Sequence, residues 1–202
     1  MRALDGSRRG NFARQALYGP QEPLLPMNST IAKLRTSLLR VPWAGGPPPS
    51  GIMPPTAREF LVLEIETADG VAGMGYLQPL SGGLETIDAC LKEMIAPRIL
   101  GRDATEIEAI WQDLWKATYW LGRGGVAIFA MSAIDIALWD LMGRRAGLPL
   151  FRLWGAASGA TPAYGSGCFR GYGREGMIDK ARTFVAKGMG AIKMQVAHIR
   201  SW

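Results

Sequence analysis

Cysteine, histidine and long apolar runs are scarce in this sequence of 202 residues. Its two cysteines, Cys90 and Cys168, are too few for a disulfide scaffold and fit a reducing, cytoplasmic compartment. With one histidine and no CxxC spacing, the sequence does not predict a zinc site. The apolar runs are shorter than a bilayer-spanning segment, so we predict no membrane association. These absences point to a globular protein of the cytoplasm.

Acidic residues are scarce toward the end of the chain. Residues 141–202 carry ten Lys and Arg but two Asp and Glu, and the whole chain has a net charge of +6. The basic residues occur singly among helix-like and strand-like segments, so we interpret them as a solvated face and predict no nucleic-acid partner. A further interpretation is that the balancing acidic residues belong to a part of the protein outside this sequence.

The first half of the chain predicts strands. Residues 1–26 are rich in Gly, Pro and Arg without periodicity, which predicts a disordered leader. Residues 31–41 read as an edge strand, and residues 42–55 form a loop dense in Gly and Pro. Two β-rich runs then flank Asp69-Gly70, which predicts a hairpin because both turn positions favour φ > 0.

Apolar periodicity predicts three helices after the hairpin, over residues 84–95, 103–120 and 126–145. We expect the first to end near Pro97, the second to be capped by Asp103 and the third to end at Gly147. A hairpin or meander followed by three helices indicates an α+β domain over residues 27–150.

The pattern changes in residues 151–202. Residues 161–169 predict a short buried strand, residues 174–187 a helix, and the stretch GMGAIKMQVA, residues 188–197, a second strand. A βαβ unit of this length implies two parallel strands.

The segment AMSAIDIALWDLMGRRAGLPLFRLWG, residues 130–155, resembles the helix signature of the mandelate racemase and muconate lactonizing branch of the enolase superfamily. The order of the predicted elements matches as well. The resemblance implies a capping domain over residues 27–150, followed in residues 151–202 by the first βαβ unit of an incomplete (β/α) TIM-type barrel.

The resemblance also implies an activity. Family members bind Mg²⁺, which stabilises the enediolate formed when a base removes the proton α to a carboxylate. The expected partner is therefore a small carboxylate, such as a sugar acid or a hydroxy acid. The family's metal ligands follow later barrel strands, so we place no metal ligand in this chain and expect the chain alone to be inactive.

Lys193 and Gln195 are the candidate catalytic residues. Family members often carry K-x-K at the end of the second barrel strand, and Lys193-Met194-Gln195 matches the first lysine only. Glutamine cannot accept an α-proton at a useful rate, which argues against racemisation by two bases and favours dehydration of an acid sugar. An ordinary surface lysine remains the alternative for Lys193.

Two loops of the capping domain close over the barrel mouth in the family, and they match residues 42–57 and 75–83 here. Trp43, Met53 and Tyr76 are therefore the candidate substrate-binding residues, with simple packing as the alternative.

Three further polar residues are weaker candidates for a functional role. We expect a structural role for His198, the one histidine, and caps or interdomain hydrogen bonds for Asp135 and Asp140.

Two other functions stay open. One is a racemase or epimerase of the mandelate racemase type, and the other is a non-catalytic, stand-alone capping domain. Family members are commonly oligomeric, so a homo-oligomer is a further expectation that follows from the resemblance.

Overall fold

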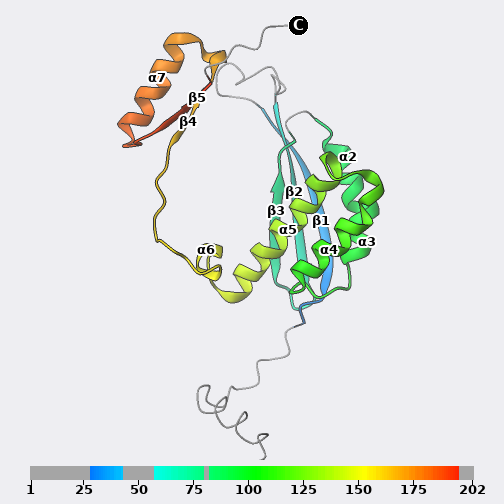
Figure 1. Cartoon of the computed structure of the whole chain (residues 1–202). Coiled ribbons are helices and arrows are strands. Elements are labelled where there is room, and N and C mark those ends of the chain that lie inside the picture. The colour runs from blue at the N-terminus through cyan, green and yellow to red at the C-terminus, as the bar shows by residue number, and fades with distance from the viewer. Residues whose placement is uncertain (1–27, 43–56, 80–81, 196–202) are drawn as a thin grey trace, which may run out of the picture.

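The computed structural model describes residues 28–42, 57–79 and 82–195, which form two groups of elements (Figure 1). The first group has the strands β1 (Ile31–Pro42), β2 (Ala57–Thr67) and β3 (Ala72–Leu77). Its helices are α2 (Leu84–Cys90), the π-helical η2 (Leu91–Ile95), α3 (Ala96–Ile99), α4 (Ile107–Ala117), the 3₁₀ turn η3 (Tyr119–Leu121), α5 (Gly125–Ala146) and α6 (Leu150–Leu153). The second group has β4 (Gly165–Cys168), the 3₁₀ turn η4 (Arg170–Tyr172), α7 (Gly173–Ala186) and β5 (Ile192–Met194). The predicted leader 1–26 lies outside the described residues.

Strands β1, β2 and β3 form an antiparallel sheet in that order, which confirms β1 as an edge strand. Every second residue of β2 points toward the helices, and Leu61, Leu63 and Ile65 are completely buried there. This alternation is typical of a sheet with one covered face. The helices therefore supply the other wall of a single apolar core.

The predicted hairpin is confirmed, but its turn differs from the expected one. Gly70 adopts φ 83°, and no residue other than glycine in the described chain has positive φ, so Asp69 stays in an ordinary conformation. The Gly70 amide donates to the Thr67 carbonyl at 2.9 Å, and the Thr67 amide donates to Val71 at 2.9 Å. These bonds close a three-residue loop, residues 68–70, in which Gly70 is the left-handed residue. The predicted two-residue turn is therefore wrong.

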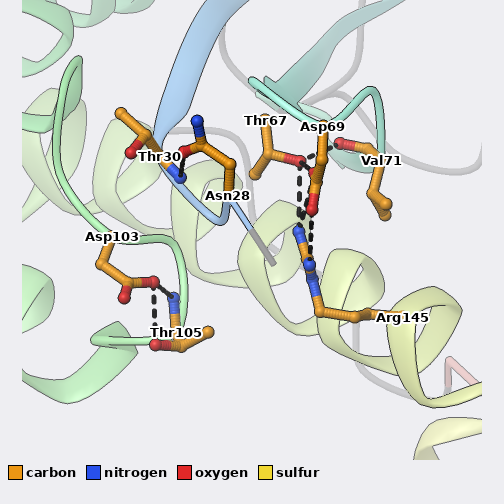
Figure 2. Close-up of polar contacts among 8 residues, drawn as sticks. All are labelled: Asn28, Thr30, Thr67, Asp69, Val71, Asp103, Thr105 and Arg145. Atoms are coloured by element: carbon orange, nitrogen blue, oxygen red, sulfur yellow. Dashed lines mark hydrogen bonds and ion pairs between the residues drawn. The ribbon is translucent and has the colours of Figure 1, made fainter. Parts of the chain in front are cut away.

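Two predicted helix boundaries are also wrong. The first helix continues beyond Pro97, because Pro97 occupies one of the first two positions of α3, where its missing amide breaks no helical bond. Asp103 does not cap α4, which begins at Ile107. Its Oδ1 instead accepts hydrogen bonds from the Thr105 amide at 2.9 Å and hydroxyl at 2.8 Å (Figure 2). A local turn thus takes the side chain that the capping pattern assigned to the helix.

Helix α5 lies unusually close to β3. A Cβ atom added to Gly75 would lie 2.1 Å from the Ala133 carbonyl oxygen, and one added to Gly73 would lie 2.2 Å from that of Ala137. The two glycines therefore allow the helix backbone to contact the strand directly. Met74, between them, donates its amide to Asp140 Oδ2 at 2.8 Å. Asp140 thereby bonds a backbone group that an edge strand leaves unpaired, within the domain rather than between domains as expected.

Within the described residues, one helix is long and apolar enough to cross a membrane by length and composition. That helix is α5, with a mean hydropathy of 1.7 in its most apolar window. Its buried side packs on the sheet and on α4, as in the core helix of a folded domain. Gly147, with φ 64°, ends α5 as predicted.

The second group contains a parallel pair of strands joined by a helix. β4 pairs with β5 in parallel, with Ser166 opposite Lys193, and α7 lies between them in the chain. Figure 1 shows this group standing apart from the three-stranded sheet, connected by the segment that follows α6. The predicted βαβ order is therefore present.

Candidate active site

Lys193 lies on the face of the β4–β5 pair that points away from α7. A Cβ atom added to Gly165 would collide with the Phe184 ring of α7, so the residues on the opposite side of β4 face away from the helix. Ser166 belongs to that opposite side, and its register partner is Lys193. In a βαβ unit the face away from the helix is the one that a closed barrel turns inward.

Tyr164, just before β4, approaches the same lysine. The Lys193 Nζ lies 5.7 Å from the centroid of the Tyr164 ring, which is within reach of a cation–π contact. Tyr164, Ser166 and Lys193 therefore share one polar face. Tyr164 and Ser166 were not predicted as site residues, although alternation in Tyr164-Gly165-Ser166 puts both on the same side of the strand.

Gln195 follows β5 directly, and its backbone is held by β4. Its amide donates to the Cys168 carbonyl at 3.0 Å. Its side-chain Oε1 is buried and accepts no hydrogen bond from the described part of the chain. A buried amide oxygen without a donor is costly, so this atom is suited to accept a bond from a bound hydroxyl group.

The predicted substrate-binding residues are only partly placed. Tyr76 lies on β3 opposite Val62, on the sheet face away from the helices, and is 57% exposed. It belongs to a different sheet from Lys193, and the structure does not bring the two together. Trp43, Met53 and His198 lie outside the described residues.

Arg145, which was not among the predicted site residues, connects α5 to the hairpin turn (Figure 2). Its guanidinium donates to Asp69 Oδ2 at 2.8 Å and Oδ1 at 3.0 Å, and to the Thr67 hydroxyl at 3.2 Å. The Arg145 side chain is only 7% exposed. Hydrogen bonds from Arg145 and then from Thr67 lower the pKa of Asp69 from 3.8 to about 2. The end of α5 is thus fixed to the hairpin turn.

Another turn in Figure 2 is local: the Thr30 amide donates to Asn28 Oδ1 at 3.3 Å.

The pKa of Asp135 is shifted in the opposite direction to that of Asp69. Burial, followed by the charge of Glu108, raises the pKa of Asp135, and no hydrogen bond from the described residues reaches its carboxylate. The expected cap or interdomain bond of Asp135 stays a prediction.

The described residues do not fit a magnesium site. Across residues 28–42, 57–79 and 82–195, no three His, Cys, Asp or Glu side chains gather closely enough to hold a metal ion. Mg²⁺ prefers carboxylate oxygens arranged octahedrally. The chemistry that these residues can supply is therefore binding and orientation of a carboxylate and its hydroxyl groups.

Comparison with known proteins places these features in a family. Residues 36–155 match the model of the mandelate racemase / muconate lactonizing enzyme N-terminal domain. The chain is 36% identical to a 3,6-anhydro-alpha-L-galactonate cycloisomerase from Streptomyces coelicolor, over 82% of this chain and 46% of the relative. It is 40% identical to a D-mannonate dehydratase from Caulobacter vibrioides, over 68% of this chain and 34% of the relative.

Solved structures agree with the sequence matches. The crystal structure of L-talarate/galactarate dehydratase from Salmonella typhimurium, with Mg and L-lyxarohydroxamate bound, superposes with a TM-score of 0.74 at 32% identity. It matches 82% of this chain and 44% of that chain. A racemase from Streptomyces coelicolor with bound magnesium gives a TM-score of 0.72 at 35% identity, over 83% of this chain and 46% of that chain. The chain thus spans less than half the length of these relatives. It belongs to the mandelate racemase / muconate lactonizing enzyme family of the enolase superfamily, and it matches the N-terminal part of the family's members; both solved structures named above carry magnesium.

Proposed function

We propose that this chain is the N-terminal part of an enolase-superfamily enzyme that dehydrates an acid sugar. The observation that carries the proposal is the pair Lys193 and Gln195 at the carboxyl end of β5. Barrel enzymes place their chemistry at this end of the strands. The chain would then contribute a capping domain and the first βαβ unit of the barrel.

The two side chains suit different tasks. The Lys193 ammonium can hold the substrate carboxylate, and the buried Gln195 Oε1 can accept a hydrogen bond from a substrate hydroxyl. An amide cannot take a proton from carbon, so the base must approach the substrate from elsewhere. Loss of the α-hydrogen and the β-hydroxyl as water gives an enol, which becomes a 2-keto-3-deoxy acid. Such a reaction does not require a second base in place of Gln195.

The names of several relatives support dehydration. They include D-mannonate, D-galactonate-family and L-talarate/galactarate dehydratases. A metal ion bound by a longer protein would stabilise the enediolate, but residues 1–202 alone should not turn over substrate. The described residues lack a carboxylate cluster to bind that ion.

Isomerisation is the second candidate, and one observation favours it. The Streptomyces coelicolor relatives carry the names cycloisomerase and racemase. Such an enzyme would need a base from outside this chain on the Gln195 side of the substrate. The two candidates differ in the fate of the α-hydrogen.

The test begins with the intact mass of the protein made by the source organism, to establish which chain carries the activity. That protein would be incubated with Mg²⁺ and D-mannonate, D-galactonate or galactarate in D₂O. We expect a 2-keto-3-deoxy acid as the product. Neither the recovered substrate nor its epimer should contain deuterium. Deuterated epimer without keto acid would assign isomerisation instead and reject the dehydratase proposal.

Two substitutions sharpen the assignment of roles. Lys193→Met should lower kcat/KM at least about 100-fold, since it removes a charge-assisted contact to the carboxylate. Gln195→Lys should introduce α-hydrogen exchange, because it supplies the missing base. Val185→Ala, on the exposed side of α7, serves as the control that leaves the activity unchanged. Wild-type kcat/KM in Lys193→Met would return that lysine to an ordinary surface role.

A further inference from the structure

Lys193 has an unusual partner for a lysine on a polar face. Lys33, for comparison, lies 2.7 Å from a Glu66 oxygen, and this ion pair offsets its charge. Within the described part of the chain, Lys193 forms no ion pair and donates no hydrogen bond. Its Nζ instead lies 5.7 Å from the centroid of the Tyr164 ring. The contact of Lys193 is therefore with an aromatic face rather than with a carboxylate.

An aromatic ring can hold an ammonium group without neutralising it. The negative face of the ring attracts the cation, but the ring carries no charge of its own. A lysine ammonium has three N–H donors, and a carboxylate partner would occupy one or more of them. With Tyr164 as its neighbour, Lys193 keeps its full charge and its donors for an anionic ligand.

The register of the two strands determines from which side the ring approaches. Ser166 is opposite Lys193, and Tyr164 lies two residues before Ser166, toward the amino ends of β4 and β5. The ring thus supports the lysine from the amino-end side. Barrel enzymes bind substrate at the carboxyl ends of the strands, so the ring does not occupy the side from which a substrate would come.

Packing in a core does not explain the aromatic residue at this position. Tyr164 is 55% exposed, and its backbone alternation puts it on the face away from α7. A lysine side chain, in contrast, gains from such a neighbour, because its four rotatable bonds lose freedom whenever it binds a ligand. A ring that already restrains the side chain reduces this loss at the moment of binding.

We propose that Tyr164 is a positioning residue for Lys193, whose ammonium group its ring holds ready for the substrate carboxylate. The proposal rests on the proposed function, since it takes from it that Lys193 binds that carboxylate. Tyr164 acts through the lysine and not on the reacting atoms. Because the ring and not the phenol hydroxyl carries the effect, Tyr164→Phe should retain it and Tyr164→Leu should lose it.

The contact itself is tested by NMR on the 202-residue chain, without any reaction. The lysines would be dimethylated with ¹³C-formaldehyde and a reductant, and the Lys193 signal would be assigned by its loss in Lys193→Arg. The ring should shift this methyl signal upfield in the wild type and in Tyr164→Phe. In Tyr164→Leu it should move to the position of the Lys33 signal, since Lys33 pairs with a carboxylate.

Two controls accompany this measurement. The Lys180 Nζ lies 5.5 Å from the Phe184 ring centroid, so the Lys180 signal should stay shifted in every Tyr164 variant. Tyr119→Leu is the matched substitution, because Tyr119 is also 55% exposed but belongs to η3. It should leave the Lys193 signal unchanged. An unshifted Lys193 signal in the wild type, or the same shift in Tyr164→Leu, overturns the proposal whether or not the proposed function is right.

The role in the reaction is tested by a double-mutant cycle in the protein made by the source organism. Tyr164→Leu should lower kcat/KM about 10-fold, mainly by raising KM, because the lysine is less well placed to bind substrate. Tyr164→Phe should stay within about two-fold of the wild type. In a Lys193→Met background, Tyr164→Leu should have almost no further effect, because the ring then has no ammonium group to hold.

The outcomes of the cycle separate this proposal from the proposed function. Equal losses from Tyr164→Leu in both backgrounds would mean that the ring acts on the substrate or on the fold. That result would overturn the positioning role and leave the proposed function in place. Wild-type kcat/KM in Lys193→Met would reject the role of Lys193 in the proposed function, and the positioning role of Tyr164 with it.

Discussion

The two groups of elements differ in how much apolar burial stabilises their folded structures. The first has a continuous core in which Leu61 of β2, Leu84 of α2 and Met131 of α5 are completely buried. The second buries few side chains, and α7 has no fully buried residue. Each fully buried Leu or Ile contributes about 1.5–3 kcal/mol, so stability should be concentrated in the first group. A cooperative domain is therefore joined to a βαβ unit that lacks most of its packing partners.

The largest effect should come from the contact between β3 and α5. In Gly75→Ala the new methyl group would meet the Ala133 carbonyl, which belongs to a helix backbone and cannot rotate away. We expect a loss of about 3 kcal/mol in the free energy of unfolding, measured by urea titration with tryptophan fluorescence. Gly159→Ala is the control, since open space surrounds that position. Equal stability of the two variants would mean that α5 does not lie against β3 as described.

The contact between Arg145 and Asp69 should appear as a smaller, pH-dependent effect. The pKa of Asp69 falls from 3.8 in an unperturbed chain to about 2 when folded. The ionised form is therefore favoured by folding, and its stabilisation is complete above about pH 4 and is lost as the pH falls toward 2. Asp69→Asn should remove this part of the acid sensitivity of the unfolding free energy.

The control for that experiment is Asp179→Asn on α7, whose carboxylate pairs with Arg182 on an exposed surface. It should leave the pH dependence of the first group unchanged. The same acid slope in wild type and Asp69→Asn would show that Arg145 does not hold the hairpin turn.

The sequence predicted the parts of the fold that depend on local pattern. The Asp69-Gly70 hairpin and the long helix around Ala137 follow from turn chemistry and apolar periodicity. The fit of Gly75 on Ala133 and the bond from Arg145 to Asp69 join positions 58 and 76 residues apart, and no local pattern reveals them. The helix-breaking tendency of proline also predicted a wrong boundary at Pro97, because a π-helical turn before it lets the helix continue.

The candidate site, like the fold, could be predicted only where it depends on local sequence pattern. The face of β5 on which Lys193 lies depends only on the alternation of side chains along a strand, whereas its proposed role in the reaction stays a prediction. Tyr164, which approaches Lys193 through space, required the pairing of two strands to be known. The proposed roles of Trp43 and Met53 stay predictions, since both residues lie outside the described chain.

The smallest effect on global stability should come from the second group. Phe184 of α7 lies over Gly165 and Gly167 of β4 and so joins the helix to the strand. In Phe184→Ala the amides of residues 165–186 should exchange with solvent faster, because their local contacts are lost. The unfolding free energy of the first group should change by less than about 0.5 kcal/mol. Leu63→Ala, a buried residue of β2, should instead cost about 2–5 kcal/mol in the same titration. If Phe184→Ala destabilised both groups equally, they would unfold as one cooperative unit, and the βαβ unit would have to be packed against the first domain.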